Sequence, residues 1–134
     1  MNQVEIIRTI KNIASNTRVK TITNGDVYDI WNSNEIKYSA INVAVEDITV
    51  HEDYTEYNFI LYFGDRLLND DSNFDFIQID GIRNLNYIIN KLKEVDYIDI
   101  VTPYTFTPFQ QRFADYLGGI YVRFTVQTSL ELNC

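Results

Sequence analysis

The sequence contains few of the residues that build covalent, metal-held or catalytic structures. Its one cysteine, Cys134, is the last residue, so no internal disulfide can form and no cysteine pair exists to hold zinc. Its one histidine, His51, lies in a polar stretch that predicts a solvent-exposed turn. No HExxH, GxSxG or glycine-rich phosphate-binding motif occurs. We therefore expect a protein that is not an enzyme and that needs no cofactor or metal.

Turn-forming residues and long apolar runs are also scarce. The chain has 5 glycines and 2 prolines against 46% hydrophobic residues, which excludes a linker-dominated or disordered protein. No apolar run is long enough to span a membrane, and the start MNQVEIIRTI has no basic stretch before a hydrophobic block. The 134 residues fit one domain, residues 1–134, and we expect it to fold in a reducing cytoplasm.

Positive charge is in short supply. There are 11 Lys and Arg residues against 19 Asp and Glu, for a formal net charge of −8. Proteins that grip nucleic-acid phosphates need clustered basic residues, and here the basic residues are scattered. Sequence-specific DNA binding is therefore not expected.

Aromatic residues are abundant by contrast: 10 Tyr, 8 Phe and 1 Trp. Their large side chains must be buried either in the core of the protein or in an interface with another molecule. An isolated tryptophan more often packs than binds, so we expect Trp31 to anchor its irregular segment onto the core.

The first half of the chain predicts a helix and a hairpin. Apolar residues recur at helical spacing over residues 2–15. Asp26 is positioned to cap a short helical turn that runs through Trp31. Residues 38–50 alternate as a strand does, with a shift at Glu46 and Asp47 that indicates a β-bulge. The return strand spans residues 57–67. Its core, residues 57–63, is apolar on both faces apart from Asn58 and must be covered on both.

The second half predicts a second helix over residues 82–95. Its buried stripe contains Ile82, Leu85, Ile88 or Ile89, Leu92 and Val95. Residues 97–101 and 104–107 follow as two short strands or as one strand interrupted at Pro103. A last alternating strand follows the pair Gly118-Gly119, which we expect to form a corner. The fold class is α+β: an antiparallel sheet with a long hairpin, flanked by two helices.

The acidic segment before the second helix matches part of the pattern of a calcium-binding loop. Asp71, Asn73 and Asp75 fit its first, third and fifth positions, but Phe76 stands where glycine is required and Ile82 where glutamate is required. The pattern fails at both discriminating positions, so an acidic surface loop is expected.

One stretch carries a more specific pattern. The segment TPFQQRFADYLGGIYVRFTVQT, residues 107–128, has a Phe-rich loop or helical turn, a small-residue break and a last alternating strand. It resembles the C-terminal part of tail-terminator and neck proteins, the head–tail connector rings of tailed bacteriophages. The order of helix, long hairpin, helix and last strand is similar to that family too, although the acidic segment before the second helix is unusually long.

The resemblance implies a non-enzymatic virion component, synthesised in the bacterial cytoplasm. Copies would form a homo-oligomeric ring of six or twelve, in contact with other phage neck, portal or tail proteins, and DNA would pass through the hole. Two sets of residues follow as candidates. The expected subunit interface contains Tyr104, Phe106, Phe109, Phe113 and Tyr116, although Phe106 and Phe113 also suit a core. The expected acidic rim of the lumen contains Asp65, Asp70, Asp71 and Asp75.

A second function class stays open. A small acidic binding module, for instance an inhibitor that mimics DNA by presenting carboxylates to a host protein, would share the composition and the negative charge. It would be a monomer or a dimer, so the oligomeric state separates the two.

Overall fold

The structure, a computed structural model, describes residues 2–33, 36–113 and 115–129. The elements follow the order α1 (Gln3–Ala14), β1 (Thr21–Asn24), α2 (Val27–Trp31), β2 (Ala40–Val50), β3 (Tyr54–Arg66), α3 (Phe74–Leu92), β4 (Ile98–Ile100), β5 (Phe106–Arg112) and β6 (Tyr116–Ser129). The lone Cys134 lies outside the described residues.

One mostly antiparallel sheet organises the chain. Its strands lie in the order β1-β2-β3-β6, and the far edge of β6 pairs with β5 along one half and β4 along the other. The short pair β1–β2 is parallel. The fold class is therefore α+β as predicted, and the hairpin β2–β3 has its register shift between Val45 and Asp47, where the sequence predicted a bulge.

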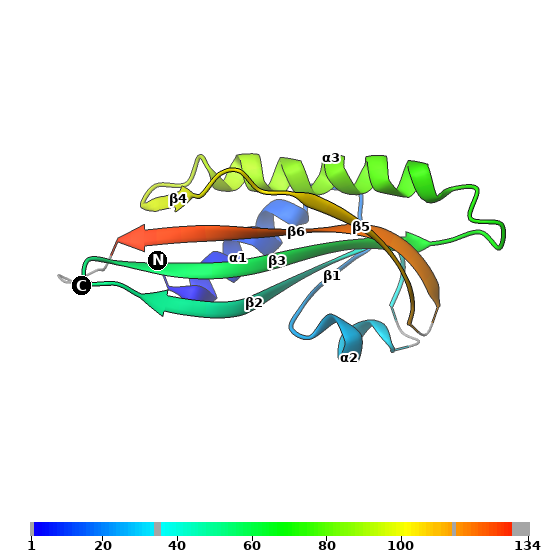
Figure 1. The fold of residues 1–134 in the computed structure, drawn as a ribbon, viewed down its shortest axis with the longest axis horizontal. Helices are drawn as coiled ribbons and strands as arrows, with labels where there is room; N and C mark the ends of the chain where they lie inside the picture. The colour runs from blue at the N-terminus through cyan, green and yellow to red at the C-terminus, as the bar shows by residue number, and fades with distance from the viewer. Residues whose placement is uncertain (1, 34–35, 114, 130–134) are drawn as a thin grey trace.

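The main core lies between one face of the sheet and two helices. Ile6 and Ile10 of α1 and Leu85 and Ile88 of α3 are buried against the odd-numbered apolar residues of β3. Helix α1 starts with a capping box, in which the Asn2 side chain accepts from the Glu5 amide and Glu5 accepts from the Asn2 amide. Figure 1 shows α3 running along the sheet on this face.

A second, smaller core covers the other face. Trp31 of α2 is fully buried against Tyr38, Phe113 and Leu117. Asp26 caps α2 by accepting from the Tyr28 and Asp29 amides, as predicted. The β5–β6 hairpin curls toward α2 at this end of the molecule (Figure 1), so the chain itself supplies the cover that the two-sided apolar strand requires.

Three sequence expectations about these elements were wrong. Helix α3 begins at Phe74 rather than at residue 82, and Ile82 is exposed, with Ile77 and Gly81 in the buried stripe instead. The aromatic segment before Tyr116 is strand β5 and not a helical turn. Gly118 and Gly119 lie inside β6 and form no corner, because both pair in register with β3 and β5.

The reason for the glycines is close contact. A Cβ on Gly119 would be 1.9 Å from the backbone oxygen of Phe63 and 2.7 Å from the Phe109 ring. A side chain there would have to displace a neighbouring strand, so close approach, and not a positive φ, requires the glycine.

Candidate interaction surfaces

The aromatic residues of the expected interface divide between the two cores. The Tyr104 hydroxyl accepts from Lys93 Nζ at 3.2 Å and donates to Asn86 Oδ1 at 3.3 Å, which ties this residue to α3. Phe106 stacks edge-on against Tyr104 and packs on the main core, half-buried. These two residues therefore make contacts within their own chain.

The other three gather at the β5–β6 end. Phe113 is buried in the second core with its ring 5.7 Å from that of Trp31, and Phe109 is half-buried between Tyr62 and Tyr121. Tyr116 is exposed, and its hydroxyl donates to Gln110 Oε1 at 3.0 Å. Phe113 thus offers little surface to another molecule, and contact of Tyr116 and Phe109 with a partner stays a prediction.

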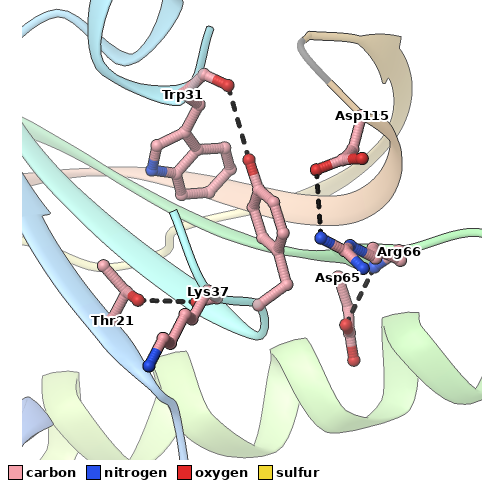
Figure 2. A network of polar contacts seen from close by, with 7 residues as sticks. Thr21, Trp31, Lys37, Asp65, Arg66 and Asp115 are labelled. Atoms are coloured by element: carbon pink, nitrogen blue, oxygen red, sulfur yellow. Dashed lines mark hydrogen bonds and ion pairs between the residues drawn. The ribbon is translucent and has the colours of Figure 1, made fainter. Parts of the chain in front are cut away.

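The acidic residues of the expected rim also divide. Asp70 and Asp71 lie in the acidic loop, defined here as residues 67–73, and Asp75 lies in the first turn of α3; all three are exposed. Asp65 is half-buried at the end of β3, where its carboxylate accepts from the Arg66 amide at 2.8 Å (Figure 2). The structure brings three of the four carboxylates, those of Asp70, Asp71 and Asp75, to one end of the molecule. That they face a lumen stays a prediction.

The acidic loop is held by its own hydrogen bonds. Asn73 accepts from the Leu68 amide at 2.9 Å and donates to the Arg66 carbonyl at 3.0 Å. Asp70 accepts from the Ser72 amide, and hydrogen bonding from Ser72 lowers the pKa of this carboxyl below its ordinary value. Asp71 adopts a left-handed φ of 59°, which aspartate tolerates better than most residues. The loop therefore presents its carboxylates in a defined arrangement.

Beside this loop, α3 exposes apolar side chains. Phe76 and Ile79 fall in the segment expected to be a loop, and Ile82 was expected to be buried. The outer stripe, defined as Phe76, Ile79 and Ile82, recurs at a spacing of three residues and so follows one side of the helix. Phe76 is 72% exposed and Ile79 is 53% exposed. The period of three at these positions is the signal that could have revealed a helix beginning before residue 82.

The first turn of α3 is fixed in place, which sets the direction of the stripe. Phe74 is half-buried, and a Cβ on Gly118 of β6 would be 2.8 Å from its ring and 2.9 Å from Leu67. Phe74 and Leu67 thus pack onto β6, and Phe76, two residues further along the helix, points away from that contact.

A hollow with the opposite charge lies on α1. This α1 hollow, of about 370 Å³, is lined by Val4, Ile7, Arg8, Lys11 and Asn12 of α1 and by Asn24 of β1. Val4 is 62% exposed, and Lys11 Nζ donates to Asn24 Oδ1 at 3.1 Å. The hollow combines apolar walls with two cations and has no carboxylate in its lining.

A polar network lies beside the second core at the end of β3. Arg66 Nη2 lies 3.4 Å from Asp115 Oδ2, and the guanidinium lies 5.9 Å from the centre of the Tyr38 ring. The Tyr38 hydroxyl in turn donates to the Trp31 carbonyl at 3.4 Å. Figure 2 shows Arg66 between Asp65 and Asp115. These contacts hold the start of β6 against β3 and α2.

His51 is held by neighbours on its own hairpin. Its ring stacks on Tyr54 with centroids 4.2 Å apart, and Nε2 lies 3.3 Å from Glu56 Oε1. Within residues 2–33, 36–113 and 115–129, no three His, Cys, Asp or Glu side chains gather closely enough to hold a metal ion. No helix in this part of the chain is long and apolar enough to cross a membrane.

No protein-family model matches the chain, and a search of curated proteins finds no significant match.

Proposed function

We propose that the protein is a structural virion component that forms a ring at the head–tail junction of a tailed bacteriophage, with DNA passing through the ring. It acts without catalysis or cofactor, and its other contacts are with neck, portal or tail proteins above and below. The element order that suggested this family, an N-terminal helix, a long hairpin, a second helix and a last strand, agrees with the observed order.

The observation that carries the proposal is the outer stripe of α3. Large apolar side chains in a row, more than half exposed in the case of Phe76 and Ile79, are typical of a surface that another protein covers. In a chain with a net charge of −8, such a stripe beside an ordered loop has no evident role in solubility. When such a surface binds a different surface of the next copy, the contacts are head-to-tail, and they close into a ring when the rotation between copies allows.

The acidic loop suits the passage of DNA. Asp70, Asp71 and Asp75 are exposed together at one end of the domain. Carboxylates that face a channel repel phosphates and leave the duplex free to slide. In a ring they would line the opening, with Asp65 set further back.

The proposal is tested by the mass and shape of the purified protein. Size-exclusion chromatography with light scattering, followed by negative-stain electron microscopy, should reveal closed rings of six or twelve 15.7 kDa copies. Mass spectrometry of purified particles of the phage whose genome encodes the protein should detect it at six or twelve copies per particle, in agreement with the ring. A monomer or dimer at high concentration that is absent from particles would contradict the proposal.

The same experiment addresses the DNA-mimic alternative. Exposed acids also lie at the far end of the β2–β3 hairpin, at Asp47, Glu52 and Asp53, and a mimic would use such carboxylates against a basic partner. A stable monomer or dimer that competes with DNA for a host nuclease or regulator would favour that function over the ring.

A further inference from the structure

Two surfaces of this chain complement one another in shape and in charge. The outer stripe of α3 is apolar and projecting, with Asp75 and Asp80 beside it; the α1 hollow is concave, with Val4 and Ile7 in its walls and Arg8 and Lys11 at its rim. We propose that they bind each other between neighbouring copies, so that the stripe of one copy occupies the α1 hollow of the next. This inference rests on the proposed ring and names its subunit contact.

Helical geometry places the acids on both flanks of Phe76 and Ile79. At 100° per residue, Phe76 and Ile79 lie opposite the face buried through Ile77, Leu85 and Ile88. On the same basis Asp75 falls on one side of them and Asp80 on the other. Arg83 Nη1, on the same side of the helix, lies 3.9 Å from Asp80 Oδ1, so the charged residues beside the stripe are two acids and one cation. A partner that covers the stripe therefore meets apolar surface and a rim with an excess of negative charge, which is the layout of a protein interface with a polar rim.

The hollow offers the matching arrangement. Arg8 is exposed, and Lys11 is held over the hollow by its bond to Asn24. The charge distribution along the chain is uneven in the same sense: Arg8, Lys11, Arg18 and Lys20 lie in the first twenty residues, where Glu5 is the only acid. Opposite charges that meet across an interface direct association and disfavour wrong pairings. A second copy of this chain carries the required acidic and apolar partner.

In a ring the contact is head-to-tail. The stripe and the hollow belong to different helices, and the N-terminal end of α3 lies at one end of the molecule while the chain's N-terminus lies toward the other (Figure 1). A copy that uses its stripe on one neighbour keeps its hollow free for the next. Contacts of this kind propagate from copy to copy and close into a ring when the rotation allows.

The test uses two charge-reversed variants of the full chain. The hollow variant carries Arg8→Glu and Lys11→Glu, and the stripe variant carries Asp75→Lys and Asp80→Lys. Each alone sets like charges against each other, and we expect its self-association to weaken by more than about tenfold. An equimolar mixture should restore the wild-type mass, because every contact then joins opposite charges. A control, Asp96→Lys with Asp99→Lys, makes the same charge change at exposed residues beyond α3 and should keep the ring.

The outcomes separate this inference from the proposed function. If the wild-type protein forms rings and either variant forms them equally well, or if the mixture stays dissociated, the contact is wrong and the ring stands. If the wild-type protein does not associate, the ring proposal fails and the contact fails with it.

Circular dichroism establishes that each variant folds. If a double variant does not fold, the single change Arg8→Glu or Asp75→Lys takes its place. Phe76→Ala should weaken the ring, whereas Val50→Ala, at another exposed apolar position, should not.

Discussion

The indole ring of Trp31 lies directly on the backbone of Gly64 in β3. A Cβ added to Gly64 would be 2.6 Å from Cζ3 of that ring, closer than real contacts of this kind allow. The ring has no room to retreat, because Trp31 is fully buried and its Nε1 donates to Thr23 Oγ1 at 3.3 Å. The second core is therefore built on a strand position that has no side chain.

This relationship predicts the effect of Gly64→Ala. Overpacking should destabilise the protein by about 1–3 kcal/mol, measured by urea unfolding followed by circular dichroism. Trp31→Phe removes the colliding ring atoms, so Gly64→Ala should cost less in that background. Equal costs in the two backgrounds would mean that the ring and the strand do not interact as described.

The two adjacent glycines of β6 should respond differently to alanine. A Cβ on Gly119 collides with the Phe63 carbonyl oxygen, which is backbone, whereas a Cβ on Gly118 meets the side-chain ends of Phe74 and Leu67. We expect Gly119→Ala to prevent folding or to cost more than about 3 kcal/mol, and Gly118→Ala to cost less because those side chains can shift. Thermal melts of both variants measure this. Similar melting temperatures would contradict the close strand contact.

The buried Asn42 ties the β1–α2 connection to the sheet. Its Oδ1 accepts from Thr23 Oγ1 at 2.7 Å and its Nδ2 donates to the Gly25 carbonyl at 2.9 Å, with no exposed surface. Asn42→Ala removes both hydrogen bonds, takes from the Gly25 carbonyl its side-chain donor, and should cost about 1–3 kcal/mol. Hydrogen exchange of the Gly25 amide, which donates to Val43, should accelerate. The same substitution at the exposed Asn90 should change stability by less than about 0.5 kcal/mol.

Tyr38 predicts a loss of stability at alkaline pH. Burial raises the pKa of its hydroxyl, and the Asp115 carboxylate adds to this while Arg66 opposes it. A pKa that is higher in the folded state means that folding favours the neutral phenol. That contribution is complete below the ordinary value of about 10 and is lost as pH rises through the folded value.

The measurement compares Tyr38→Phe with the wild type across pH 9 to roughly 11. The variant should lose less stability over this interval, since it has no buried phenol to ionise. Tyr97→Phe, at a position 80% exposed, serves as the control and should follow the wild type. Parallel curves for all three proteins would show that Tyr38 ionises freely in the folded state.

Local pattern predicted a large part of this fold. The apolar spacing of residues 2–15 corresponds to α1, and the alternation that shifts at Glu46 and Asp47 corresponds to β2 with its register change. The cap at Asp26 and the buried role of Trp31 were also predicted correctly. Each of these features depends on side chains within a few positions of one another, so the sequence carries the whole signal.

The candidate site was predicted less well. The acids of the loop were recognised, but Phe76 and Ile79 were assigned to the same loop, since Asp70, Asp71 and Asp75 masked the helical spacing behind them. The five aromatic residues were taken as one group, yet strand pairing sends Tyr104 and Phe106 to one core and Phe113 to the other.

By itself, the sequence determined which segments are amphipathic, how the hairpin pairs and how strongly acidic the molecule is. Tertiary structure alone decided that β5 pairs with β6, that α2 and this hairpin cover the second face, and that part of α3 stays uncovered. The physical reason is distance along the chain. Periodicity reports neighbours within a turn or a strand, whereas the burial of Phe113 and the exposure of Phe76 depend on elements that only folding brings together.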